Sequence, residues 1–80
     1  MYLEELRLKQ GISVRTLAKR AEVPYTTMLE LVRGKKSVER AAAETVFRIS
    51  NVLNVSMEEI IVESIRERER KEKEMNEEKE

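Results

Sequence analysis

Residues 13–35 read SVRTLAKRAEVPYTTMLELVRGK and contain the signals for two short helices. Ser13 can cap the first helix, because its side-chain oxygen can accept a hydrogen bond from a free backbone N–H. Apolar residues then follow at the i, i+3, i+4, i+7 spacing of a helix with one buried face, namely Val14, Leu17, Ala18 and Ala21. Pro24 disfavours helical geometry at the residue before it but is favourable at a helix start. The chain therefore turns sharply around Val23, and a second helix begins directly after it.

The second helix is predicted to run to Arg33. Met28, Leu31 and Val32 repeat the i, i+3, i+4 spacing, and Gly34 supplies the left-handed conformation that usually ends a helix. Two short helices that meet at a four-residue turn are the layout of a DNA-binding helix-turn-helix.

Features outside this stretch extend the pattern. The residues that carry the pattern, inside and outside this stretch, are Leu3, Leu6 and Arg7, Gly11-Ile12-Ser13, Leu17-Ala18, Val23, Thr27-Met28, Leu31, Arg33-Gly34-Lys35, and Leu53-Asn54-Val55-Ser56. Over about residues 3 to 61, their joint spacing resembles the lambda-repressor-like, Cro-type helix-turn-helix of the XRE family. The resemblance implies an all-α fold, a compact five-helix domain that binds DNA without catalysis and needs no cofactor. It also implies that Val14 to Ala21 is the supporting helix and that Tyr25 to Arg33 is the recognition helix, whose N-terminal residues enter the major groove.

The other helices follow from the same signals. A first helix is predicted over residues 2–10 and ends at Gly11. A fourth is predicted over residues 43–53 and ends at Asn54, which tolerates left-handed geometry. In the loop between the recognition helix and the fourth helix, Ser37 could cap a short turn.

The fifth helix is predicted to start at a capping box, in which Ser56 is the cap and the Glu59 side chain reaches back to it. Its apolar face closes the core and consists of Met57, Ile60, Ile61 and Ile65. Residues 66–80 are almost entirely charged, and opposite charges spaced i, i+4 favour a solvated helix there. We therefore predict a helix-turn-helix domain over residues 1–65 and a charged extension over residues 66–80 that is helical or disordered.

The composition narrows the function classes. The 80 residues include no cysteine and no histidine, which removes disulfides, thiol nucleophiles and the commonest metal ligands. The longest apolar runs, Ile60 to Val62 and Ala41 to Ala43, are far short of a membrane span, and the N-terminus lacks the layout of a signal peptide. The sequence therefore predicts a cytoplasmic protein with no membrane partner.

The charges give a weaker indication of the partner. Sixteen basic and sixteen acidic residues cancel, so the net charge does not point to a polyanion. Residues 1–62 hold ten basic and eight acidic residues, and residues 63–80 hold six basic and eight acidic ones. The folded part is therefore weakly basic, and any DNA binding is expected to depend strongly on salt.

Two sets of residues are candidates for DNA contact on the resemblance. The base-reading candidates are Tyr25, Thr26, Leu29 and Glu30. The phosphate-binding candidates are Ser13, Arg15, Thr27, Lys35, Lys36 and Arg40. The hydroxyls of residues 25–27 can instead satisfy N–H groups at the helix start, and the basic residues can instead be ordinary solvated charges.

Three positions depart from the usual family pattern. Val14 stands where the family often has a glutamine that binds a phosphate, so one contact is lost. Val32 stands where a buried glutamate commonly pairs with the arginine equivalent to Arg7, so Arg7 must find another acid or solvent. Glu22 stands where the turn usually has glycine, and left-handed geometry costs such a residue roughly 1–2 kcal/mol.

The leading functional hypothesis is a sequence-specific transcriptional regulator, a repressor or autoregulator that binds double-stranded DNA as a homodimer. Val62 and Ile65 are the expected dimer contact. By analogy, the protein could be an antitoxin whose charged tail binds a toxin. The alternative is a protein-interaction module that has lost DNA binding. An enzyme is not expected, because no nucleophile–base set accompanies the paired acids Glu58-Glu59, which a helix N-terminus explains.

Overall fold

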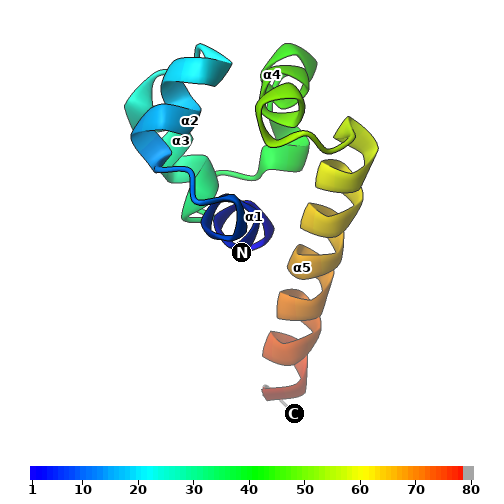
Figure 1. Ribbon diagram of the computed structural model, residues 1–80. Helices are drawn as coiled ribbons and strands as arrows, with labels where there is room; N and C mark the ends of the chain where they lie inside the picture. Colours follow the sequence, from blue (N-terminus) through cyan, green and yellow to red (C-terminus); the bar gives the residue numbers. More distant parts are fainter. Residues whose placement is uncertain (79–80) are drawn as a thin grey trace.

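The structure is a computed structural model that describes residues 1–78, with side chains up to Lys73. Its helices are α1 (Tyr2–Gln10), α2 (Val14–Ala21), α3 (Tyr25–Val32), the 3₁₀ helix η1 (Val38–Arg40), α4 (Ala43–Leu53) and α5 (Met57–Glu78). In Figure 1, α2 and α3 lie together on one side of the molecule, and α5 runs along the other side and extends beyond the body. The predicted all-α fold with five α-helices is confirmed. None of the helices described is long and apolar enough to cross a membrane.

The core draws apolar side chains from all five α-helices and η1. The fully buried ones include Leu17 of α2, Met28 of α3, Ile49 and Leu53 of α4, and Ile60 of α5, each 0% exposed. Leu3 of α1 and Val38 of η1 are also buried. Leu17, Met28 and Ile60 lie on the inward faces that helical spacing predicts, whereas the burial of Val38 in the loop was not predicted. The result is that α2 packs against both α3 and α4.

The helix ends largely follow the predicted signals. The Ser13 Oγ accepts a hydrogen bond from the Thr16 N–H at 3.0 Å and so caps α2. Left-handed geometry occurs at all four expected positions, with φ of 68° at Gly11, 56° at Glu22, 79° at Gly34 and 55° at Asn54. One boundary was wrong by a residue. The α3 helix ends at Val32, because Arg33 is its C-cap and the Gly34 N–H then bonds to the Leu31 carbonyl in a tighter turn.

Of the two further caps predicted, the one at Ser37 does not form and the box at Ser56 forms in part. Ser37 precedes η1, but within the described residues its side chain makes no capping hydrogen bond, and its carbonyl oxygen accepts from the Arg40 N–H at 3.1 Å instead. Ser56 caps α5 as predicted, since its Oγ accepts from the Glu59 N–H at 3.0 Å. The Glu59 side chain does not reach back, because it accepts a hydrogen bond from the Tyr2 hydroxyl at 2.6 Å.

The Tyr2–Glu59 hydrogen bond ties α1 to α5 across 57 positions of sequence. Burial, followed by the hydrogen bond to Glu59 and the charges of Glu59 and Glu63, raises the pKa of Tyr2 above its ordinary value. The hydroxyl therefore stays protonated near neutral pH and remains a donor to Glu59.

Arg7 finds the acidic partner that Val32 cannot supply. It forms an ion pair with Glu4 one turn earlier on α1, and its Nη1 donates to the Ile12 carbonyl oxygen at 3.0 Å. The Arg7 side chain is only 15% exposed. The pair with Glu4 therefore takes the place of the long-range pair that is common in the family. The hydrogen bond to the Ile12 carbonyl holds the turn between α1 and α2.

Glu22→Gly is expected to stabilise the fold, because glycine adopts φ near 56° without a Cβ clash. Glu22 also lies 3.7 Å from Arg48, but such an exposed pair contributes less than ~1 kcal/mol. Glu22→Ala is the control, since it loses the same ion pair and keeps the Cβ. In urea unfolding followed by circular dichroism, the free energy of unfolding of the glycine variant should exceed that of the alanine variant by about 1 kcal/mol. Equal stabilities would show that the backbone at this position carries no strain.

Candidate nucleic-acid interface

The outer side of α3 faces away from the core, because Met28, Leu31 and Val32 bind the opposite side to the other helices. The four predicted base-reading residues all have accessible side chains there. Tyr25 and Thr26 are exposed, and Leu29 and Glu30 are half-buried. The packing of α3 thus leaves a mainly polar outer face from Tyr25 to Glu30.

A shallow groove runs along this outer face. It has a volume of about 320 Å³ and is lined by Thr26, Leu29, Glu30, Arg33 and Lys35. Three of the four base-reading candidates therefore come together, while Tyr25 lies outside the groove. Arg33 is an addition that sequence reasoning missed by treating it only as the helix end. Its spacing of i+4 from Leu29 and i+7 from Thr26 would have placed it on the same face.

Tyr25 instead joins the N-termini of α2 and α3. The Arg15 guanidinium carbon lies 4.9 Å from the centroid of the Tyr25 ring, which is cation–π geometry. An exposed contact of this kind is worth about 0.5–1 kcal/mol. Arg15 is thereby held at the edge of the α3 face with its charge directed at solvent. The contact links a phosphate-binding candidate to a base-reading candidate, a pairing that the sequence did not predict.

The Ser13 hydroxyl forms its hydrogen bonds within the first turn of α2. Besides accepting from the Thr16 N–H, its hydroxyl lies 2.9 Å from the Thr16 Oγ1, to which it donates. The unpaired N–H groups in the first turn of α2 remain available for an anion, and the helix dipole favours one there. A phosphate contact at Ser13 would therefore use the backbone rather than the side chain.

The remaining phosphate-binding candidates gather after α3. A cleft of about 450 Å³ between α3 and the start of α4 is lined by Thr27, Lys36, Arg40 and neighbouring residues of the loop. The loop folds back onto α3 at its start, because the N–H groups of Lys35 and Lys36 donate to the Glu30 carbonyl oxygen at 2.9 and 3.2 Å. Lys35 lies in the groove on the outer face instead.

Glu30 and Lys36 also approach each other through their side chains. The Lys36 Nζ lies 3.8 Å from the Glu30 Oε1, and the Lys36 side chain is 56% exposed. An ion pair of this length and exposure contributes little to stability. A phosphate can therefore displace Glu30 from Lys36, which would free the carboxylate for a base.

Positive and negative charges separate more clearly when the chain is divided around the helix-turn-helix than when it is divided at residue 62. Residues 12–42 hold seven basic and three acidic residues, a net charge of +4. Residues 43–80 hold seven basic and eleven acidic ones, a net charge of −4, and residues 1–11 are neutral. The basic segment coincides with α2, α3 and the following loop, which is the electrostatic footprint expected for a polyanion. The zero net charge of the chain conceals this separation.

A capped helix, a sharp turn and a second helix with an exposed face flanked by basic side chains define a helix-turn-helix protein. The model of the Cro/C1-type HTH DNA-binding domain family matches residues 2–63 of the chain. The chain belongs to this family, and it is a DNA-binding regulator. No curated protein and no solved structure matches it.

Proposed function

We propose that the protein is a sequence-specific transcriptional regulator, a repressor or autoregulator, that reads its operator with α3 and binds it as a homodimer. The observation that carries this proposal is the groove on α3. It combines the polar side chains of Thr26 and Glu30 with the basic ones of Arg33 and Lys35. Arg15 lies outside the groove, over the ring of Tyr25, so a second phosphate could be bound beside the start of α3.

The side chains in the groove have distinct recognition chemistry. Glu30 can accept a hydrogen bond from a cytosine amino group, and Arg33 can donate to two acceptors of guanine. Thr26 can contact a base edge or a thymine methyl group, and Leu29 can contact only the methyl group. The proposal therefore favours an operator half-site in which G·C pairs face the C-terminal part of the groove.

The experiment that tests this function is binding to DNA fragments from the upstream region of its own gene at two salt concentrations. The wild type should prefer particular fragments and weaken steeply as salt rises, because binding releases counterions from the phosphates. The double variant Thr26→Ala, Glu30→Ala should lose the preference and keep weak non-specific binding. The control is Asn51→Ala, Glu58→Ala, which alters exposed side chains of α4 and α5.

A second candidate function is protein binding on a helix-turn-helix fold that no longer binds DNA. The Glu30–Lys36 ion pair favours it, since an acid on the reading face of α3 occupies a nearby lysine. The same salt series separates the two functions. Absence of binding to any fragment at low salt would favour the protein-binding candidate, and the charged surface of α5 would then be the first place to seek a protein partner such as a toxin.

The dimer part of the proposal rests on Val62, which is 36% exposed on α5, with Ile65 half-buried on the same helix. Val62→Glu is expected to give a monomer that binds the operator more weakly, because one α3 helix buries too little surface for tight specific binding. Leu8→Glu is the control, since Leu8 is an exposed apolar residue of α1. Sedimentation of both variants gives the oligomeric state. A dimer that survives Val62→Glu would place the interface elsewhere, with Phe47 of α4, 52% exposed, the next residue to change.

A further inference from the structure

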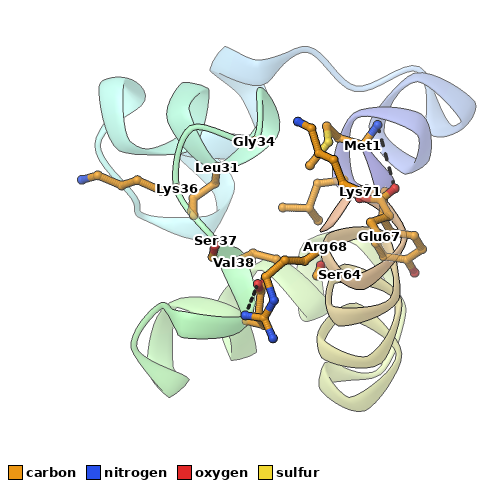
Figure 2. Close-up of a pocket in the computed structure, with 13 residues that line it drawn as sticks. Met1, Leu31, Gly34, Lys36, Ser37, Val38, Ser64, Glu67, Arg68 and Lys71 are labelled. Atoms are coloured by element: carbon orange, nitrogen blue, oxygen red, sulfur yellow. Dashed lines mark hydrogen bonds and ion pairs between the residues drawn. The ribbon is translucent and has the colours of Figure 1, made fainter. Parts of the chain in front are cut away.

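An ion pair connects the C-terminal helix to the loop that follows α3. The Arg68 Nη1 of α5 lies 3.2 Å from the Glu39 Oε1 of η1. The Glu39 side chain is only 6% exposed, whereas that of Arg68 is 33% exposed. Figure 2 shows Arg68 extending from α5 toward the loop beside Ser37 and Val38, and a dashed line marks the ion pair.

The acid in this pair lies among the cations proposed to bind phosphate. Glu39 immediately precedes Arg40 and follows Lys36 by three residues. An unpaired carboxylate at this position would either remain buried, which is strongly unfavourable, or turn outward and repel the DNA backbone. Arg68 neutralises Glu39 from a different helix. The basic side chains of the loop are therefore left free of this acid.

Apolar packing and the ion pair together hold this part of the loop to α5. Val38 is buried, but a cavity of about 130 Å³ lies between the loop and α5, with Gly34, Lys36, Glu39, Arg68 and Lys71 among its lining residues. At its start the loop is held to α3 through the Glu30 carbonyl. The Glu39–Arg68 pair is thus a second link between η1 and α5, beside the packing of Val38, and its loss would loosen the middle of the loop.

We propose that Arg68 is a positioning residue for DNA binding, which acts through Glu39 to hold the loop that presents Lys36 and Arg40 to phosphates. This inference rests on the proposed function. It assigns α5, through a residue beyond the helix-turn-helix, a direct influence on DNA affinity. A protein partner that binds α5 and engages Arg68 would accordingly weaken DNA binding.

The test compares Arg68→Ala with Arg70→Ala. Arg70 is an exposed residue two positions further along α5, so both variants remove one positive charge from the same helix. Operator binding by Arg68→Ala should weaken by about tenfold, equivalent to ~1.4 kcal/mol. The slope of log affinity against log salt should become shallower by about 1–2, because each lost phosphate contact removes about 0.9. Arg70→Ala should leave the slope unchanged.

Two further readouts separate positioning from a general loss of stability. All affinities are measured at a temperature where thermal unfolding shows every variant to be folded. Amide hydrogen exchange in residues 37–41 should accelerate in Arg68→Ala and not in Arg70→Ala. Glu39→Gln breaks the same ion pair and should likewise accelerate exchange and make the salt slope shallower, and adding Arg68→Ala to it should change neither quantity further.

Three results would contradict the inference. A slope and exchange rates in Arg68→Ala equal to those in Arg70→Ala would show that the ion pair does not position the loop. Effects of Arg68→Ala and Glu39→Gln on exchange and salt slope that simply add in the double variant would show that Arg68 does not act through Glu39. Both results leave the proposed function intact if the wild type binds its operator. Absence of DNA binding by the wild type at low salt would overturn the proposed function and this inference with it.

Discussion

Leu17→Ala is expected to lower the free energy of unfolding by about 2–5 kcal/mol, the range for truncating a fully buried leucine. Leu17 is 0% exposed and lies on α2, which packs against both α3 and α4. The cavity would open between α2 and the two helices that pack against it. Because small domains are stable by only about 5–15 kcal/mol, this single change removes a large share of the total.

Urea unfolding of the Leu17→Ala variant, followed by circular dichroism, measures this effect. Leu8→Ala is the matched control, because it makes the same substitution at a residue of α1 that is 61% exposed. The control should change stability by less than ~0.5 kcal/mol. A similar small effect at both positions would mean that α2 does not pack as the structure describes.

The triple variant Lys35→Ala, Lys36→Ala, Arg40→Ala is expected to lose up to about a thousandfold in DNA affinity. The magnitude follows from about 1.5 kcal/mol for each charge-assisted contact to phosphate. The slope of log affinity against log salt should become shallower by about 2–3, because three phosphate contacts are removed. Fluorescence anisotropy of labelled operator DNA over a salt series gives both quantities. The preference among DNA sequences should change little, since phosphate contacts do not read bases.

The matched control for the triple variant is Lys9→Ala, Arg70→Ala, Lys73→Ala. It removes the same number of positive charges from exposed positions on α1 and α5. If net charge alone governs binding, the two variants will weaken equally. A much larger loss in the first variant would locate the phosphate contacts on the loop after α3.

Local signals predicted the helices well. Ser13, Gly11 and Asn54 act within a few residues of their own position, and helical periodicity marks the buried face of each element. The core residues Leu17, Met28 and Ile60 could therefore be identified before their neighbours were known. The α3 end at Val32 and the side-chain bonds of Ser37 and Glu59 differed from the prediction, because tertiary contacts compete with local ones at helix ends.

Contacts between distant parts of the chain were beyond this reasoning. The Tyr2 hydroxyl donates to the Glu59 carboxylate, which therefore does not complete the capping box. Arg68 pairs with Glu39 across 29 positions of sequence. Neither pair is marked by spacing, since each exists only because α5 packs beside α1 and η1. A buried glutamate in a loop sequence looks like any other acidic residue until the structure shows what lies opposite it.

The face of α3 was largely predictable and its surroundings were not. Thr26, Leu29 and Glu30 follow from helical geometry alone. The Arg15–Tyr25 contact depends on the angle between α2 and α3, which left-handed geometry at Glu22 sets. The assignment of these residues to bases or phosphates remains a prediction for the binding experiments.

Residues 12–42, which form α2, α3 and the following loop, carry a net charge of +4, whereas the chain as a whole is neutral. In the field of a DNA duplex this uneven distribution produces a torque that turns the basic segment toward the DNA before any contact forms. Fewer collisions then involve the wrong face, so the association rate should exceed that of an isomer with the same charges mixed evenly.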